Sequence, residues 1–524
     1  MRILSLVIFC LAAFPALADH FHTRLAAAVA TDDPAVLEAE VRSALNDAEA
    51  DADIDQVVAF WRDFYTTFGT TRPETLRLIG RWREEYPDSA LAMTADAESR
   101  ERLASLLRGG ALAGDTNLPS LVAFGALYRR SADLAEAAIE ADPHMLGAYF
   151  VLFNAHMTGH GSMPIRRLID AAFDISPTSD TVDAAAAVFN PRWGGSVDQM
   201  LQVCADYAPR AKDYDAEACG INIAFDFPQD QVLVASARRA LATRTGPWAD
   251  RMRFNEFLHF PEPPTPERTE WLINYHRDHF EDHGSPIGWL SIARTLSFRL
   301  DQRLYLIEAE DRALPQVAAY IARDPYDYRR LTSFIEYVQN TSLRDNPAWR
   351  ARLRPMWLDA MVYGRLNPGL WGKGADIMAS PWWDVEAAYP YYVNSVVTEE
   401  SPAGTLGYAL KSMLHVRQAI GYGAADNPAP GEPGKEEVLA FLDCAEARFA
   451  RLMVAACKGN GEWYCRAGDS GMAAALKIDA ELSRGRVCPE LADATALDLA
   501  FTELMPVPEV EDHLAGIDLG ITFK

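Results

Sequence analysis

The sequence predicts an all-α protein in which helical hairpins stack into a superhelical solenoid, followed by further helical segments. Apolar residues recur at the i, i+3, i+4, i+7 spacing of one helix face between Ile54 and Phe68. Alternating strand-like runs bounded by hairpin turns are nearly absent. Prolines close successive helical stretches at intervals of 34, 32 and 38 residues. A period of this length indicates a helical repeat.

The first 18 residues are expected to be a signal peptide. Arg2 precedes an apolar run of eleven residues, 3–13, and Ala16-Leu17-Ala18 offers a small-x-small cleavage site. The run is too short to span a bilayer, which takes about 20 residues, and no later segment is long and uncharged enough. We therefore expect cleavage near Ala18, a periplasmic or secreted location and no integral membrane segment.

The chain is strongly acidic, with 74 acidic residues against 49 lysines and arginines and a net charge of −25. A surface of this charge repels phosphate backbones and anionic lipid headgroups, so no nucleic-acid partner is expected. It favours solubility and, at most, basic partners or cations.

Residues 19–260 are expected to form the repeat domain. A small residue lies five positions before each repeat-closing proline, which lets two antiparallel helices approach closely before the proline stops the second one. The prolines are Pro143, Pro177, Pro209 and Pro247, and the small residues are Ala138, Ala172, Cys204 and Ala242.

These features resemble the tetratricopeptide (TPR) family over residues 130–250. With Pro177 as the terminal proline of a repeat, Tyr149, Leu152 and His156 occupy the places of the family's tryptophan, leucine and inner tyrosine. Phe153 stands where a small residue is usual, which indicates a degenerate repeat. The resemblance implies stacked helical hairpins whose concave surface grips a peptide or another protein.

The segment Trp193-Gly194-Gly195-Ser196 is interpreted as a structural turn between two helices. Glycine lets the backbone reverse, and Ser196 with Gln199 forms a capping box at the start of the next helix. A phosphate-binding loop would need a lysine and a preceding strand, and both are missing. The residues around this turn, with the segment 82–89, also resemble an uncharacterised bacterial domain family with a Trp-Gly-Gly motif, which brings no known activity.

Three further segments complete the predicted organisation. Residues 261–421 form a second helical segment that begins at a proline-rich break and contains an aromatic-rich stretch at 371–392. The aromatic rings there either fill a bend between helices, which we favour, or stack on sugars or clamp a peptide. Residues 422–435 are a Pro/Gly linker, and residues 436–524 form a cysteine-containing helical segment.

Six cysteines remain after the leader, an even number that is compatible with disulfides in an exported protein. Cys204 with Cys219 is one plausible bridge, and pairs within the last four are others; the alternative is that they are small buried apolar side chains. The last four are Cys444, Cys457, Cys465 and Cys488.

One histidine row is a candidate metal site. His276, His279 and His283 lie three, four and seven positions apart, so a continuous helix would place them on one face, and His279 with His283 would have zinc-ligand spacing. The row also continues an apolar line from Leu272, so a buried seam without metal is the favoured interpretation. No other cofactor is expected.

Together these observations favour an exported scaffold that binds a protein or peptide in a concave groove, rather than an enzyme. Two alternatives remain open. One is an extracytoplasmic hydrolase that acts on cell-wall glycan or peptide, with the aromatic stretch as its substrate wall and no catalytic residue identified. The other is a metal-binding accessory protein that uses the histidine row.

Overall fold

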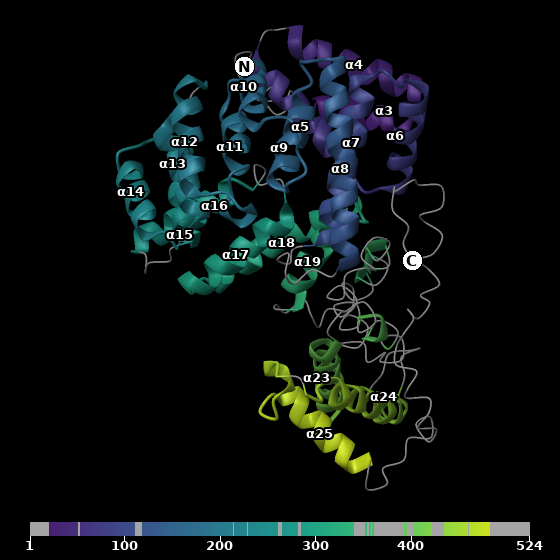
Figure 1. The fold of residues 1–524 in the computed structure, drawn as a ribbon. Helices are drawn as coiled ribbons and strands as arrows, with labels where there is room; N and C mark the ends of the chain where they lie inside the picture. Colours follow the sequence, from purple (N-terminus) through teal and green to yellow (C-terminus); the bar gives the residue numbers. More distant parts are fainter. Residues whose placement is uncertain are drawn as a thin grey trace, which may run out of the picture. The chain divides into compact units, whose positions relative to one another are not determined.

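The structure, a computed structural model, describes residues 20–339 apart from 51–52, 110–117, 213, 228, 260–264 and 281–284. Further along it describes 402–421, 434–459 and 461–482, with short helical pieces between 352 and 395. These residues form helices and turns, and no strand occurs among them (Figure 1). The prediction of an all-α protein is confirmed. Within the same residues, no helix is both long and apolar enough to cross a membrane.

The chain forms two compact units. The first contains the described residues up to Ser105 together with Phe124–Asp324, and the second contains those of Leu106–Ala123 and Pro325–Ala515. The segment break expected at residue 261 lies inside the first unit, which continues to Asp324. This part of the unit contains α16 (Pro266–Asp278), which packs on α17 (Pro286–Leu300). α17 in turn packs against α18 (Arg303–Ala322).

The first unit begins with five helices whose apolar faces meet. They are α3 (His20–Ala30), α4 (Pro34–Ala50), α5 (Ile54–Phe68), α6 (Pro73–Glu85) and α7 (Ala90–Arg108). α5 follows the apolar stripe expected from the sequence and buries Phe60, Trp61, Phe64 and Phe68. α3 packs on α4 and α5, and α4 packs on α6.

A buried carboxylate joins α4 to the elements that follow. Glu38 accepts hydrogen bonds from the indole Nε1 of Trp82 at 2.8 Å and from the hydroxyl of Ser89 at 2.7 Å, and it pairs with the Arg42 guanidinium. Since Ser89 directly precedes α7, this one side chain fixes the entry of α7 against α4 and α6. A buried charge is tolerated where its oxygens are satisfied in this way.

The repeat region consists of short helices that end at regular intervals. The helices are α8 (Leu118–Ala141), α9 (Leu146–Met157), α10 (Ile165–Ile175), α11 (Ser179–Ala187), α12 (Val197–Tyr207), α13 (Ala216–Asp226), α14 (Gln231–Ala242) and α15 (Pro247–His259). The alternate helices α8, α10, α12 and α14 end 34, 32 and 35 residues apart. Pro247 departs from the expected role, because it begins α15 instead of closing a helix.

Neighbouring helices of this region pack in two ways. α9 packs on α10, α11 on α12 and α13 on α14, so consecutive helices form antiparallel pairs. The first helices of these pairs also pack on one another, α9 with α11, α11 with α13 and α13 with α15 (Figure 1). Three of the four expected small residues, Ala138, Ala172 and Cys204, are buried. The expectation was wrong for Ala242, which is exposed, because α14 buries Leu241 at its end instead.

Residues 190–196 connect α11 to α12. Asn190 Oδ1 accepts from the Arg192 amide at 2.9 Å, Gly194 has a φ of 95°, and the Ser196 hydroxyl accepts from the Gln199 amide at 3.2 Å. A side chain at Gly195 would lie 2.1 Å from the Phe189 carbonyl oxygen. Trp193 is half-buried. Glycine is required here by the close approach of two backbones and by the positive φ.

Disulfides link cysteines in both units. Cys204 of α12 bonds to Cys219 of α13, with their Cα atoms 5.6 Å apart. Cys457 bonds to Cys465, with Cα atoms 5.1 Å apart, and Cys444 is disulfide-bonded as well. Cys488 lies outside the described residues.

The second unit contains α19 (Tyr328–Gln339), α23 (Pro402–Gly421), α24 (Lys435–Ala456) and α25 (Ser470–Leu482). α24 packs on both α23 and α25, and the Cys457–Cys465 bridge closes the connection between α24 and α25. Most of the aromatic-rich stretch 371–392 and nearly all of the expected linker lie outside the described residues.

Candidate functional site

The histidine row does not continue along one helix. α16 ends at Asp278, and the backbone N–H of His279 caps it by donating to the Tyr275 carbonyl oxygen. His276 is buried, with its Nδ1 paired to the Tyr305 hydroxyl, and His283 lies outside the described residues. Among the residues that the structure describes, no three histidine, cysteine, aspartate or glutamate side chains are close enough to hold a metal ion.

Two of these histidines instead line a cleft between α15, α16 and α17. The cleft has a volume of about 640 Å³, within the range of sites that hold a small ligand or a few side chains. Its walls are mainly apolar and aromatic: Trp248, Phe254, Tyr275, His276, Trp289 and Ile292. Three polar side chains also face it, Arg251, Asn255 and His279.

The aromatic walls are held by contacts between rings. The His276 ring lies nearly parallel to Trp289, with centroids 4.4 Å apart, and to Phe254, at 5.8 Å. Tyr275 stacks on His279 at 4.0 Å. The Trp289 indole also donates to the His276 carbonyl oxygen at 3.0 Å. Side chains from three helices are thereby fixed before any ligand arrives, which lowers the entropic cost of binding.

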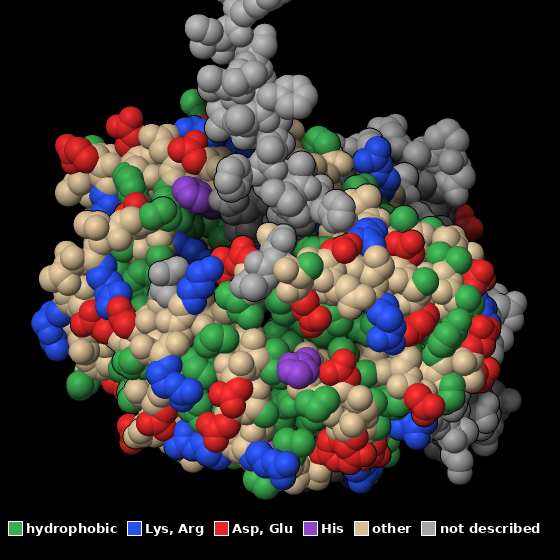
Figure 2. Space-filling model, turned by 90° about the horizontal axis from the view of Figure 1, so that it is seen from above, with side chains coloured by type: hydrophobic (Ala, Val, Ile, Leu, Met, Phe, Trp, Pro, Cys, Tyr) green, Lys and Arg blue, Asp and Glu red, His purple; other side chains and the backbone are tan. Residues whose placement is uncertain are grey.

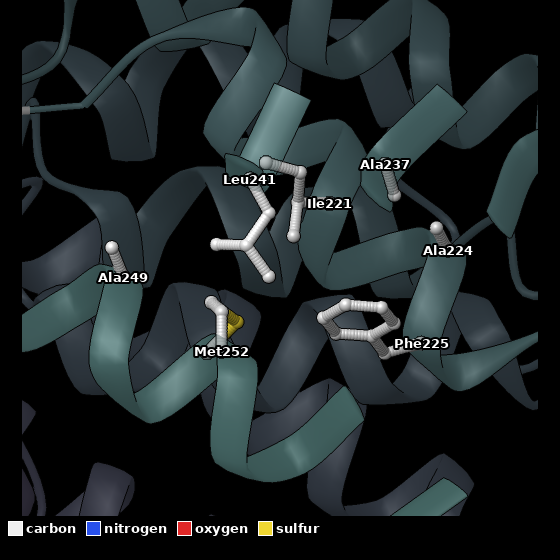
Figure 3. Packing of buried hydrophobic residues seen from close by; sticks show 7 residues of the cluster. All are labelled: Ile221, Ala224, Phe225, Ala237, Leu241, Ala249 and Met252. Carbon is white, nitrogen blue, oxygen red and sulfur yellow. The ribbon is translucent and has the colours of Figure 1, made fainter. Parts of the chain in front are cut away.

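α15 presents its cleft residues because its opposite face is buried. Trp248, Arg251 and Asn255 follow the i, i+3, i+7 spacing of one helix face. Figure 3 shows Met252 of α15 directed toward Phe225 of α13 and Leu241 of α14, within an apolar cluster that Trp248 borders. The other members of the cluster are Ile221, Ala224, Ala237 and Ala249. This core sets the rotation of α15 and therefore the direction of its polar side chains.

The polar groups of the cleft are available to a ligand. His279 Nδ1 donates to the Tyr275 carbonyl oxygen at 2.7 Å, since a carbonyl oxygen can only accept. Among the described residues, Arg251 and Asn255 have no hydrogen-bond or ion-pair partner for their side chains. The cleft thus offers a positive donor, an amide and a ring nitrogen next to apolar walls.

Two buried carboxyl groups of α7 were not singled out by the sequence. Glu98 and Glu101 are 2% and 6% exposed. Burial raises the pKa of Glu101 to about 8. The hydrogen bond that Asn154 Nδ2 donates to Glu101 Oε1 at 2.8 Å acts in the other direction and lowers this pKa. Burial, with the Glu101 carboxylate nearby, also raises the pKa of Glu98. One oxygen of each carboxyl group has no hydrogen-bond partner among the described residues.

Comparisons with known proteins add no constraint on the site. No protein-family model matches the chain, and no curated protein is significantly similar to it in sequence. The geometry of the cleft is therefore the basis for the function proposed below.

Proposed function

We propose that the protein is an exported TPR-like scaffold that holds a peptide segment of a partner protein in the cleft between α15, α16 and α17. Three features support the TPR-like superhelix. Alternate helices end 34, 32 and 35 residues apart, consecutive helices pair, and the first helices of the pairs pack in a row. The expected leader, residues 1–18, supports export.

One observation carries the binding role: Arg251 and Asn255, which make no hydrogen bond or close ion pair with the described residues, lie beside pre-packed aromatic walls, and Asp183 interacts with Arg251 only at longer range. Arg251 and Asn255 come from the same face of α15 as Trp248. Interfaces concentrate their binding energy in aromatic and arginine side chains of this kind. The amide of Asn255 can pair with a peptide backbone, since it offers both a donor and an acceptor.

The packing of the rings favours a peptide over a glycan. Sugars stack on open aromatic faces, whereas here the His276 face is covered by Trp289 and the Tyr275 face by His279. The His276 and Tyr275 rings are thus engaged by other rings, and the apolar lining of the cleft suits the side chains of a peptide. Protein partners also agree with the surface in Figure 2, where acidic, basic and apolar side chains are interspersed.

In the test, peptides that bind the wild-type protein are first selected from a random display library. The affinity of each selected peptide is then measured by fluorescence anisotropy. Arg251→Glu reverses the charge in the cleft, and Arg239→Glu on α14 makes the same change at an exposed arginine outside it. We expect the first substitution to weaken binding about tenfold or more, as for loss of a hydrogen bond to a charged group, and the second to leave it unchanged.

If no peptide is selected, or if the selected peptides bind equally to wild type and Arg251→Glu, the proposal is wrong. Circular dichroism of both variants verifies that they are folded, which is expected because both side chains are exposed.

A further inference from the structure

A second cleft lies next to the first and has a different chemistry. It is formed by α14, α15 and α16, with a volume of about 490 Å³. Three arginines line it, Arg238, Arg253 and Arg268, together with two carboxylates, Asp250 and Glu256. Trp271 forms an apolar wall beside them. The two clefts share helices α15 and α16.

Among the lining residues that the structure describes, three arginines face two carboxylates. Arg238 pairs with Glu256 at 2.8 Å, and Arg253 pairs with Asp250 at 2.8 Å. Arg253 also donates to the Leu241 carbonyl oxygen at 3.2 Å, so its guanidinium is well satisfied. Arg268 only approaches the already paired Glu256, at 4.0 Å. Its side chain is 42% exposed and can turn toward a ligand.

The charge balance of this region differs from that of the whole chain. The three helices that form the cleft, α14, α15 and α16, contain six arginines and five acidic residues, whereas the whole chain carries 74 acidic residues and 49 basic ones. Charges farther away than about 8 Å are largely screened at physiological ionic strength. At contact, the arginines of the cleft therefore decide which ligand is favoured.

α16 connects the two clefts through adjacent aromatic side chains. Trp271 lines the arginine cleft and Tyr275, one helical turn later, lines the aromatic cleft, with ring centroids 5.4 Å apart. A partner that lies across α15 and α16 contacts both clefts, because the distance between residues four apart on a helix is only about 6 Å.

We infer that the arginine cleft binds a carboxylate of the partner peptide, either an acidic side chain or a free C-terminus, next to an apolar group that packs on Trp271. The carboxylate lies beside the ion pairs of Arg238 and Arg253 and gives Arg268 a closer anion than Glu256 at 4.0 Å. Arg268 makes the new contact, since guanidinium and carboxylate match in planar, paired geometry. This inference rests on the proposed peptide-binding function and names the chemistry of the ligand.

The experiment is a double-mutant cycle between the protein and the selected peptides. In each peptide, every carboxylate is replaced in turn by its amide: Asp by Asn, Glu by Gln, and the C-terminus by a carboxamide. Each version is measured against wild type, Arg268→Gln, and the matched control Arg239→Gln. Arg268 is exposed, so its replacement leaves the fold intact.

One carboxylate is expected to couple to Arg268. Its amidation and the Arg268→Gln substitution each weaken binding about tenfold, and the two together weaken it little more than either alone. Arg239→Gln shows no coupling to any carboxylate. If peptides bind and depend on Arg251 but no carboxylate couples to Arg268, the inference is overturned while the proposed function stands. If binding does not depend on Arg251, the proposed function itself fails.

Discussion

Glu101 contributes to the pH dependence of the stability of the first unit, and Glu101→Gln is expected to remove that contribution. The carboxyl group is buried in α7 and accepts from Asn154 Nδ2 at 2.8 Å. Glutamine keeps the accepting oxygen and the shape of the protonated acid, but it cannot ionise. The substitution therefore isolates the cost of burying an ionisable group.

The sign and size of the pH effect on stability follow from the protonation of Glu101 in the folded state and in the unfolded state. Burial raises the pKa of Glu101 from 4.5 to about 8 in the folded protein. Between these values the folded state binds a proton that the unfolded state has released, so the free energy of unfolding falls as the pH rises from about 4.5 to 8. A tenfold difference in proton affinity corresponds to about 1.4 kcal/mol, so the whole loss is on the order of 5 kcal/mol.

The assay is urea unfolding at several pH values between 5 and 8.5, followed by far-ultraviolet circular dichroism. Glu101→Gln and wild type are expected to have similar stability at pH 5, and the variant is expected to be the more stable at pH 8. Glu140→Gln, at an exposed position of α8, serves as the control and leaves the wild-type dependence unchanged. The reasoning would be refuted if the free energy of unfolding changed equally with pH in wild type and Glu101→Gln, or if the variant were less stable than wild type at pH 8.

Three further predictions concern stability, each measured by the urea midpoint at pH 7. Gly195→Ala is expected to destabilise by more than 1 kcal/mol, since the new methyl group would lie 2.1 Å from the Phe189 carbonyl oxygen; an unchanged midpoint would mean that the turn is not constrained. Replacing Cys204 and Cys219 together by alanine is expected to cost about 3 kcal/mol, because the bridge closes a loop with a sequence separation of 15. Reduction of the wild type, which also opens the Cys457–Cys465 bridge, should cost at least as much. Glu38→Ala is expected to cost about 3 kcal/mol or more, because it leaves buried donors without an acceptor; a cost below 1 kcal/mol would contradict the assigned bonds.

The sequence predicted those features that depend on local pattern. The helix at Ile54–Phe68 follows from its apolar spacing, and the intervals between helix ends follow from residues that stop helices. The Cys204–Cys219 pair, one of the bridges considered, is present in the structure. Ala242 shows where the pattern failed: the residue before it, Leu241, is the one that packs, and only the rotation of α14 against α13 decides between them.

The cleft depends on how separate helices pack, which no local pattern records. Arg251, Tyr275 and Trp289 come from three helices, and each taken alone has the spacing of an ordinary helix face. The spacing of the histidine row suggested one helix face, but the helix ends at Asp278, and the rings of His276 and His279 line the cleft.

The sequence did not predict the buried carboxyl groups of Glu98 and Glu101, for a similar reason. Charged residues at 96, 98 and 101 of α7 resemble a solvated helix face in sequence, and only contact with neighbouring helices encloses them.

Hydrogen–deuterium exchange with and without a selected peptide tests the central claim most directly. If the cleft between α15, α16 and α17 holds the peptide, exchange slows in Pro247–His259, Pro266–Asp278 and Pro286–Leu300, and it stays unchanged in α4 and α6. Slower exchange confined to other helices, with these three unaffected at saturating peptide, would contradict the account.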